Sequence, residues 1–140
     1  MASAARLYSP EVLALATSLA QWPLADDLPL TGAARSPACG STLTLGLDLD
    51  DTGRVCRIGV RAQACAIGQA AAAIFAAAAV GRTRAEIADT LAALERWLVA
   101  SGPQPDWPGL NAIAPARDFH GRHGAMLLPW RAALEALPTA

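Results

Sequence analysis

Apolar residues recur at helical spacing from the ninth residue of the chain onward. In "SPEVLALATSLAQWP", Ser9 suits the N-cap and Pro10 the first helical position, and Pro23 ends the pattern. The residues at helical spacing, which we expect to face the core, are Val12, Leu13, Ala16, Leu19 and Ala20. The sequence therefore predicts an amphipathic helix, followed by an extended segment over residues 24–41.

The spacing changes to strict alternation at Thr42. In "TLTLGLDLDD", four leucines alternate with smaller or polar residues and would share one face of a strand: Leu43, Leu45, Leu47 and Leu49. "DDTGRV" is typical of a turn, and "VCRIGVRAQA" alternates again, which places Cys56 on the inner side with Ile58, Val60 and Ala62. We therefore expect a β-hairpin over residues 42–62 with one buried face, and Cys56 as a core residue.

Three further helices are predicted after the hairpin. "ACAIGQAAAAIFAAAAVG" is apolar nearly all round, which is typical of a centrally packed helix. Thr83 and Glu86 form a capping box for the next helix, which we expect to end at Gly102. Its inward positions are Ile87, Leu91, Leu94 and Leu98, with Trp97 beside them. Residues 103–124 are loop-like, and the last helix, "AMLLPWRAALEAL", carries Pro129 near its start, where a missing N–H group matters least.

The order of these elements predicts an α+β fold. A small antiparallel β-sheet, made of the hairpin 42–62 and at most a short edge strand in addition, packs against about four helices. The length of 140 residues fits one domain, so we expect a single domain over residues 1–140.

Composition and charge narrow the function classes. A net charge of −1 with scattered arginines gives no field that would attract nucleic acid. The longest apolar run, residues 70–80, is far shorter than the roughly 20 residues that span a bilayer. The first ten residues, "MASAARLYSP", lack the apolar region of a signal peptide. We expect a cytoplasmic protein that binds neither nucleic acid nor membrane.

Three cysteines carry the candidate chemistry, and their spacing matches no CxxC motif. In a reducing compartment they are better read as thiols or metal ligands than as disulfide partners. Cys39 lies in "SPACGS", a loop that Pro37 and Gly40 shape. Cys65 directly precedes a helix, whose N-terminus stabilises a thiolate. The hairpin would bring both thiols to the same end of the sheet, which suits metal, cluster or sulfur chemistry.

Five segments, in order, resemble the U-type iron–sulfur cluster assembly scaffold family (the IscU, SufU and NifU N-terminal domain group). "LYSPEVLALA" resembles its opening helix, and "LTGAARSPACGS" its first ligand loop, which typically reads Pro-x-Cys-Gly-Asp. "VCRIGVRAQACAIGQAAAAI" resembles the second ligand segment and "VGRTRAEI" the Gly-Lys-Thr link. "RHGAMLLPWRAAL" resembles the Arg-x-x-Cys-x-Leu-Leu-Pro-Trp segment with the third cysteine. The resemblance implies a SufE/NifU-like fold.

The resemblance also implies a function. Members of this family accept sulfur from a cysteine desulfurase, bind iron or zinc, and assemble a cluster that they pass to cluster-accepting proteins. Their ligands are three cysteines and an Asp or His. Thiolates suit this role because they are soft donors for iron and zinc. Cys39 and Cys65 fall on the first two cysteine positions, and the resemblance implies that they bind the iron–sulfur cluster or zinc.

The chain departs from the family's ligand set at two positions. Ser41 stands where the family has its Asp, and Ala125 stands where it has its third cysteine. The glycines that usually precede the second cysteine are replaced by Ala62 and Ala64. A neutral hydroxyl is a poor metal ligand, and a methyl group cannot act as one. We therefore expect impaired binding of the cluster or metal, and the alternative is that the site binds no cofactor.

His120 and His123 lie just upstream of the vacated cysteine position, and a neutral imidazole binds zinc or iron well. The candidate metal ligands are therefore Cys39, Cys65 and His123, and the alternative is that both histidines are solvated loop residues. Cys56 would join the site only if the strand phase were shifted by one residue.

Three functions remain open on the sequence, none of them an enzyme. The first is a scaffold-like protein that binds iron, zinc or sulfur through Cys39 and Cys65. The second is a metal-free persulfide acceptor for a cysteine desulfurase, and the third is a degenerate binding or regulatory partner without chemistry. The expected partners are a cysteine desulfurase and cluster-accepting proteins, with the chain itself a monomer or a weak homo-oligomer.

Overall fold

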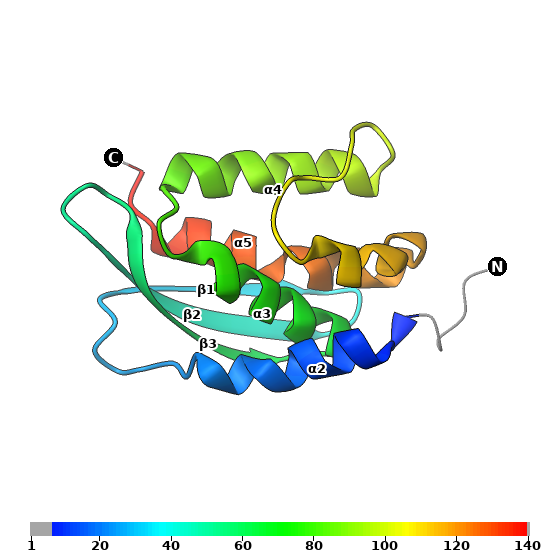
Figure 1. Cartoon of the computed structure of the whole chain (residues 1–140), viewed down its shortest axis with the longest axis horizontal. Helices are drawn as coiled ribbons and strands as arrows, with labels where there is room; N and C mark the ends of the chain where they lie inside the picture. Colours follow the sequence, from blue (N-terminus) through cyan, green and yellow to red (C-terminus); the bar gives the residue numbers. More distant parts are fainter. Residues whose placement is uncertain (1–6, 140) are drawn as a thin grey trace.

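The computed structural model describes residues 7–139 (Figure 1). Its elements in chain order are α2 (Pro10–Ser18), η1 (Leu19–Gln21), β1 (Leu30–Ser36), β2 (Ser41–Leu49), β3 (Val55–Gln63), α3 (Ala66–Ala79), α4 (Arg84–Leu98), η2 (Leu110–Ala112), η3 (Ala114–Asp118), η4 (His120–Arg122) and α5 (His123–Ala136). The predicted α+β fold is confirmed. Within residues 7–139, the fold consists of helices α2 to α5 and an antiparallel sheet with strand order β1-β2-β3.

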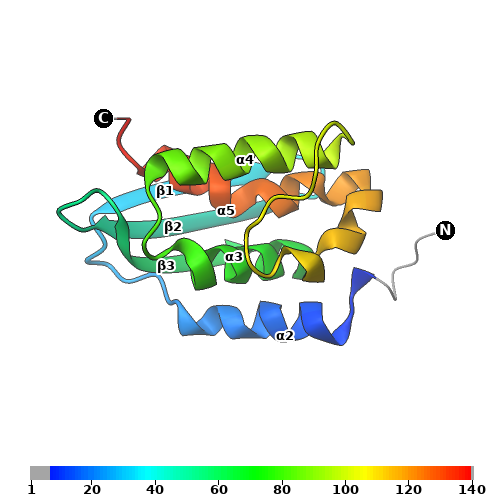
Figure 2. The same cartoon turned by 45° about the horizontal axis from the view of Figure 1, so that its top comes forward.

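Helices α3 and α5 lie side by side on one face of the sheet (Figure 2). Helix α5 packs against β1 and β2, and α3 packs against β3. Helix α4 packs on α5, and α2 packs on α3, so these two helices lie at the periphery. The β1–β2 loop and the beginnings of α2, α3 and α5 all lie at the right-hand end in Figure 1.

The sheet contains the predicted hairpin and the edge strand that the sequence left open. β2 and β3 pair from Thr42↔Gln63 to Leu49↔Val55, and β1 pairs with β2 from Leu30↔Leu47 to Ser36↔Ser41. Leu43, Leu45 and Leu47 are buried on the inner face, as the alternation predicts. β1 is thus a seven-residue strand within the segment predicted as extended.

Cys56 is exposed, so its prediction as a core residue was wrong. The register is irregular between Asp48 and Leu49: Asp48 faces Arg57 and Leu49 faces Val55. Cys56 is therefore the extra residue of a β-bulge, which shifts the phase of the strand by one residue. Val55, only 1% exposed, takes the inward position.

The outer face of the sheet has a covered strip where two glycines are paired, Gly46 and Gly59. A Cβ atom on Gly59 would lie 2.3 Å from the carbonyl oxygen of Pro23, and one on Gly46 would lie 2.8 Å from the side chain of Leu28. Only glycine therefore lets the segment between α2 and β1 cross the sheet this closely.

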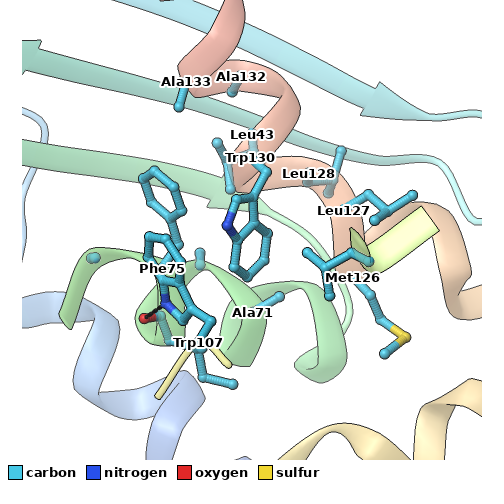
Figure 3. Close-up of a cluster of buried hydrophobic side chains, with 14 of the residues drawn as sticks. Leu43, Ala71, Phe75, Trp107, Met126, Leu127, Leu128, Trp130, Ala132 and Ala133 are labelled. Atoms are coloured by element: carbon cyan, nitrogen blue, oxygen red, sulfur yellow. Dashed lines mark hydrogen bonds between the residues drawn. The ribbon is translucent and has the colours of Figure 1, made fainter. Parts of the chain in front are cut away.

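Three aromatic rings fill the space between the helices that cover the sheet (Figure 3). The rings belong to Phe75 in α3, to Trp130 in α5, and to Trp107 in the connection between α4 and α5. Their centroids are 5.4 Å apart in every pair. Trp107 stacks on Phe75, Trp130 meets both edge-on, and the Trp107 indole N–H donates to the carbonyl of Ile74 at 3.0 Å. This aromatic trio anchors the long connection between α4 and α5 in the core.

The predicted helices are present, but the buried face of α2 and the first residue of α5 differ from the prediction. The Ser9 hydroxyl caps α2, but Leu13 is 50% exposed, and Leu15 packs against the core instead, because α2 packs mainly on α3 and buries only a narrow stripe. Helix α5 begins at His123, two residues earlier than expected, so Pro129 lies in its middle rather than near its start. Its ring removes the N–H group that would bond the carbonyl of Ala125.

Helix α4 has the predicted capping box between Thr83 and Glu86, although it ends at Leu98, before Gly102. Its buried side chains are Ile87, Leu94, Trp97 and Leu98. Among the described residues, no helix is both long enough and apolar enough to cross a membrane. The expectation drawn from the first ten residues rests mainly on residues 1–6, which lie outside the described part of the chain.

Candidate functional site

Cys39 lies in the four-residue connection between β1 and β2. Ser36 and Ser41 pair across the two strands and close this loop, and the Gly40 N–H donates to the Ser36 carbonyl at 2.8 Å. Gly40 has a φ of 71°, a left-handed conformation that glycine adopts without strain. The tight loop that the sequence predicts around this thiol is present, and the thiol itself is half-buried.

Two buried serine hydroxyls hold the Cys39 thiol. Its Sγ lies 3.1 Å from Ser41 Oγ and 3.4 Å from Ser36 Oγ. Both serines are almost fully buried, at 3% and 1% exposure, so their hydroxyls need partners inside the protein. The thiol donates to a hydroxyl when it is neutral, and the hydroxyls donate to the sulfur when it is a thiolate.

Cys65 occupies the N-cap position of α3, with an extended backbone. Its backbone N–H donates to Ser41 Oγ at 3.5 Å, and its carbonyl accepts from the N–H of Gln69 at 3.0 Å. The Ser41 hydroxyl therefore contacts both the sulfur of Cys39 and the backbone of Cys65. The structure brings the two thiol-bearing residues together at one end of the sheet, as the hairpin predicts.

The first turn of α5 fills the space where the family has its third cysteine. A Cβ atom on Gly124 would lie 2.3 Å from Ser36 Oγ, so only glycine fits against the end of β1 there. A Cβ atom on Gly68, one turn after Cys65, would lie 3.5 Å from the Ala125 methyl group. Ala125 is thus fully buried against the beginning of α3, and its methyl group offers no ligand.

Arg122 supplies the positive charge of the site. Its Nη2 donates to the Tyr8 hydroxyl at 3.1 Å, and its buried Nε has no hydrogen-bond partner in the described part of the chain. No ion pair found among residues 7–139 includes this guanidinium. The hydrogen bond to Tyr8 and the interaction with the Tyr8 charge raise the pKa of Arg122, and the charges of Cys65 and Cys39 raise it further, against the opposing effect of burial. Arg122 therefore interacts electrostatically with both thiols.

The pKa of Cys39 lies below the ordinary value of a cysteine. Burial is the largest single influence and raises it, but hydrogen bonds from the side chains of Ser36 and Ser41, a backbone hydrogen bond at Ser41 and the positive charge of Arg122 together outweigh burial. The lower pKa favours the thiolate, which is the nucleophile and the metal ligand.

The two histidines contact other elements. The His123 Nε2 lies 2.6 Å from the carbonyl oxygen of Arg117, and because a carbonyl only accepts, Nε2 carries the hydrogen and only Nδ1 is left to ligate. His123 lines a hollow with Glu95, Leu98 and other residues of α4 and α5. The exposed His120 ring lies 4.9 Å from the His123 ring, between centroids. Ligation by either histidine remains a prediction.

The donors of the site do not fit a complete metal centre. Within residues 7–139, no three His, Cys, Asp or Glu side chains gather closely enough to hold a metal ion. Zinc and iron–sulfur clusters take four protein ligands in closed sites, and this chain offers two thiols. Cys56 does not add a third, because the bulge that exposes it lies at the other end of the hairpin.

Three contributors were missed on the sequence: Ser36, Arg122 and Tyr8. The symmetry of "SPACGS", with a serine on each side of the loop, is a signal that could have identified Ser36. Arg122 stands at the arginine of the Arg-x-x-Cys pattern, but its contact with Tyr8 joins residues far apart in the chain and leaves no local signal.

Solved structures support the resemblance. The N-terminal part of a nitrogen-fixing NifU-like protein from Brucella abortus matches with a TM-score of 0.84 and 28% identity, over 94% of this chain and 92% of that one. A protein described as an iron–sulfur cluster assembly scaffold of the SUF system, from Fervidobacterium islandicum, matches with a TM-score of 0.79 and 18% identity, over 97% and 100%. A hypothetical protein matches with a TM-score of 0.61 and 20% identity, over 89% and 95%.

No family model matches the sequence, and no curated protein matches it. The solved structures nevertheless confirm the predicted resemblance to the U-type iron–sulfur cluster assembly scaffold family. They also confirm the NifU-like fold class.

Proposed function

We propose that this protein acts in iron–sulfur cluster assembly as a scaffold-like protein that binds sulfur or metal through Cys39 and Cys65, with impaired cluster ligation. The 28% identity to a NifU-like protein over nearly the whole chain supports this assignment. So does the shared fold with a described scaffold of the SUF system. In this proposal iron, sulfide and the assembled cluster are cargo, and residues 1–140 act as one domain.

One observation carries the proposal: the Ser41 hydroxyl contacts both thiol-bearing residues. It lies 3.1 Å from the Cys39 sulfur and 3.5 Å from the Cys65 backbone nitrogen. Two half-buried thiols at one end of a sheet, beside a cation without a carboxylate partner, form a site for sulfur or for a thiophilic metal. A degenerate partner without chemistry has no need of this arrangement.

Metal or cluster binding requires ligands in addition to Cys39 and Cys65. Since Ser41 and Ala125 stand at the positions of the missing ligands, Cys39 and Cys65 supply half of a tetrahedral set. Completion by His123, or by a residue of a second protein, is the metal-binding form of the proposal.

Sulfur acceptance requires only one competent thiol. The lowered pKa of Cys39 and its place on an exposed loop favour this thiol as the acceptor of a persulfide sulfur. This metal-free form is the second candidate, and it is favoured by the incomplete ligand set. A cysteine desulfurase is the proposed donor, cluster-accepting proteins are the proposed recipients, and the cytoplasm is the proposed compartment.

The two forms are separated by measuring metal and sulfur on the same protein. Zinc and iron are quantified in protein purified without added metal and again after anaerobic reconstitution. Mass spectrometry then tests for the addition of one sulfur atom after incubation with a cysteine desulfurase and cysteine. Cys39→Ser and Cys65→Ser are compared with Cys56→Ser, a matched control because Cys56 is exposed and lies away from the site.

We expect sulfur on Cys39 in the Cys56→Ser protein and none in the Cys39→Ser protein. Metal that disappears with both Cys39→Ser and Cys65→Ser supports the metal-binding form. Protein that takes up neither sulfur nor metal, while remaining folded, contradicts the proposal and leaves the role of a partner without chemistry.

A further inference from the structure

The two site thiols form a pair without a third ligand. In the position of the third cysteine, the fully buried Ala125 methyl group packs against the start of α3. In the position of the acidic ligand, Ser41 holds the pair together through contacts with Cys39 and Cys65. Two cysteines that contact the same hydroxyl, in a site without a complete set of metal ligands, are able to form a disulfide when their sulfur atoms meet.

The two thiols differ in how firmly the fold holds them. Cys39 lies on a loop whose other residues, Pro37, Ala38 and Gly40, are exposed. A Cβ atom added to Gly40 would meet nothing within 4 Å, so there is open space at the residue that follows Cys39. Cys65 is fixed at the N-cap of a buried helix. Both thiols are half-buried, and the exposed loop favours Cys39 as the thiol that takes sulfur from an external donor.

We propose that this pair reduces a sulfane sulfur to sulfide: Cys39 accepts the sulfur as a persulfide, and Cys65 releases it by forming a Cys39–Cys65 disulfide. This inference rests on the sulfur-accepting form of the proposed function. The substrate class is a persulfide or polysulfide donor. The product is the sulfide that cluster assembly consumes, formed once per pair of thiols.

The reaction balances without a metal. The Cys39 thiolate first attacks the outer sulfur of the donor, a bond forms between that sulfur and the Cys39 Sγ, and the donor's S–S bond breaks. The rest of the donor leaves with the bonding electron pair, as a thiolate or a shorter polysulfide. Cys65 then loses its proton and its thiolate attacks the Sγ of Cys39, so that a bond forms between the two Sγ atoms and the bond to the outer sulfur breaks. The outer sulfur leaves with the bonding electron pair and takes up the proton that Cys65 lost, so that it departs as hydrosulfide. Two thiols have lost two electrons, the sulfur has gained them, and an external dithiol must reduce the disulfide before a second cycle.

Arg122 is placed to assist this step as a positioning residue. Its guanidinium feels the charges of both Cys39 and Cys65, donates to Tyr8, and has an Nε without a hydrogen-bond partner among residues 7–139. Negative charge moves from Cys65 to the departing sulfur during the attack. A fixed cation that interacts electrostatically with both cysteines stabilises this charge during the transfer.

The test uses the full chain with Cys56→Ser, so that no exposed third thiol reacts. The reduced protein is treated with inorganic polysulfide, the excess is removed, and sulfide release and intact mass are followed together. We expect one sulfide per chain and a mass that falls to that of the Cys39–Cys65 disulfide. Adding Cys65→Ser should leave a persulfide on Cys39 and slow the release by at least about a hundredfold, because attack within one site gains strongly from proximity.

Ser41→Ala and Ser36→Ala form a matched pair. Both remove a hydroxyl that contacts Cys39, but only Ser41 also contacts Cys65. We therefore expect Ser41→Ala to slow sulfide release more than Ser36→Ala does. Arg122→Gln should slow it while persulfide still forms, and Arg122→Lys should recover part of the loss.

A persulfide that persists on Cys39 with Cys65 intact overturns this inference and leaves the proposed function standing. Failure to form any persulfide removes the sulfur-accepting form of the proposed function and this inference together. As an independent check of geometry, mild oxidation of the Cys56→Ser protein with diamide should link Cys39 to Cys65. The inference is also overturned if peptide mapping finds only other products.

Discussion

At the scale of single residues, the hydroxyl of Ser41 links the two cysteines of the site. It accepts from the N–H of Cys65 and lies within hydrogen-bonding distance of the Cys39 sulfur. A carboxylate in its place would add a negative charge and a ligand. A hydroxyl adds no charge and is a poor ligand. The two cysteines therefore share a contact with Ser41, but the set of metal ligands around them is incomplete.

The first prediction concerns metal affinity. Ser41→Asp combined with Ala125→Cys places the family's residues back at both departures, so that with Cys39 and Cys65 the chain offers four ligands. We expect one zinc ion per chain, bound at least about a hundredfold more tightly than by the unmodified protein. Competition with a chromogenic chelator measures this, and the same double variant carrying Cys39→Ser is the control. Equal zinc affinity in the double variant and the unmodified protein would contradict the family's alignment at these positions.

The second prediction concerns pH. Because the pKa of Cys39 is lowered, its reactive thiolate persists to lower pH than that of an ordinary cysteine. Removing a donor, as in Ser41→Ala or Ser36→Ala, raises this pKa, so the rate of alkylation of Cys39 at a fixed neutral pH should fall. The measurement is the pH profile of iodoacetamide labelling at Cys39, by peptide mass spectrometry. An unchanged profile in both variants would show that the hydroxyls do not stabilise the thiolate.

The sequence predicts the two site cysteines but not what surrounds them. A cysteine on a Pro/Gly loop and a cysteine before a helix are local patterns, and the hairpin between them implies their meeting. Arg122 reaches Tyr8 across most of the chain, and no spacing rule connects the two residues. Long-range contacts of this kind follow from the packing of α5 and α2, which only the folded chain establishes.

At the scale of elements, the errors arise where a pattern has two readings. "VCRIGV" places either Val55 or Cys56 inward, and the β-bulge that selects Val55 has no signature in the alternation. The sequence predicts a start of α5 at Ala125 because "HGRHG" is typical of a loop, yet His123 and Gly124 begin the helix. Gly124 lies there because the buried Ser36 leaves no room for a side chain.

The third prediction tests the covered strip of the sheet. Gly59→Ala would bring a Cβ atom to 2.3 Å from the carbonyl oxygen of Pro23, a backbone atom that cannot give way alone. We expect the free energy of unfolding to fall by about 1–3 kcal/mol, as overpacking does in a close-packed region. Urea denaturation measures this. Gly121→Ala is the control, because a Cβ atom there meets nothing within 4 Å, and it should change stability much less.

At the scale of the whole molecule, the order of elements was the most predictable feature. A helix, a hairpin and three helices follow from periodicity, and all of them pack as one layer of sheet covered by helices. The position of Trp107 was not predictable, because it lies in a segment rich in proline that reads as a loop. Its stacking on Phe75 and edge contact with Trp130 make that segment part of the core.

The fourth prediction is a gradient of amide hydrogen exchange. Helix α3 is buried along most of its length, so its amides should exchange only when the whole domain unfolds. Residues 37–40 are largely exposed and should exchange orders of magnitude faster. Exchange followed by mass spectrometry checks this, with the exposed β2–β3 turn as a fast reference. Equal protection in α3 and the Cys39 loop would contradict the gradient.

The burial of α3 has a consequence for the rate of the proposed sulfur transfer. On the expected exchange gradient, Cys65 lies at the start of the most protected helix, whereas Cys39 lies on one of the least protected loops. For the proposed transfer, this means that the motion of residues 37–40, and not any motion of α3, limits how fast the two sulfur atoms meet.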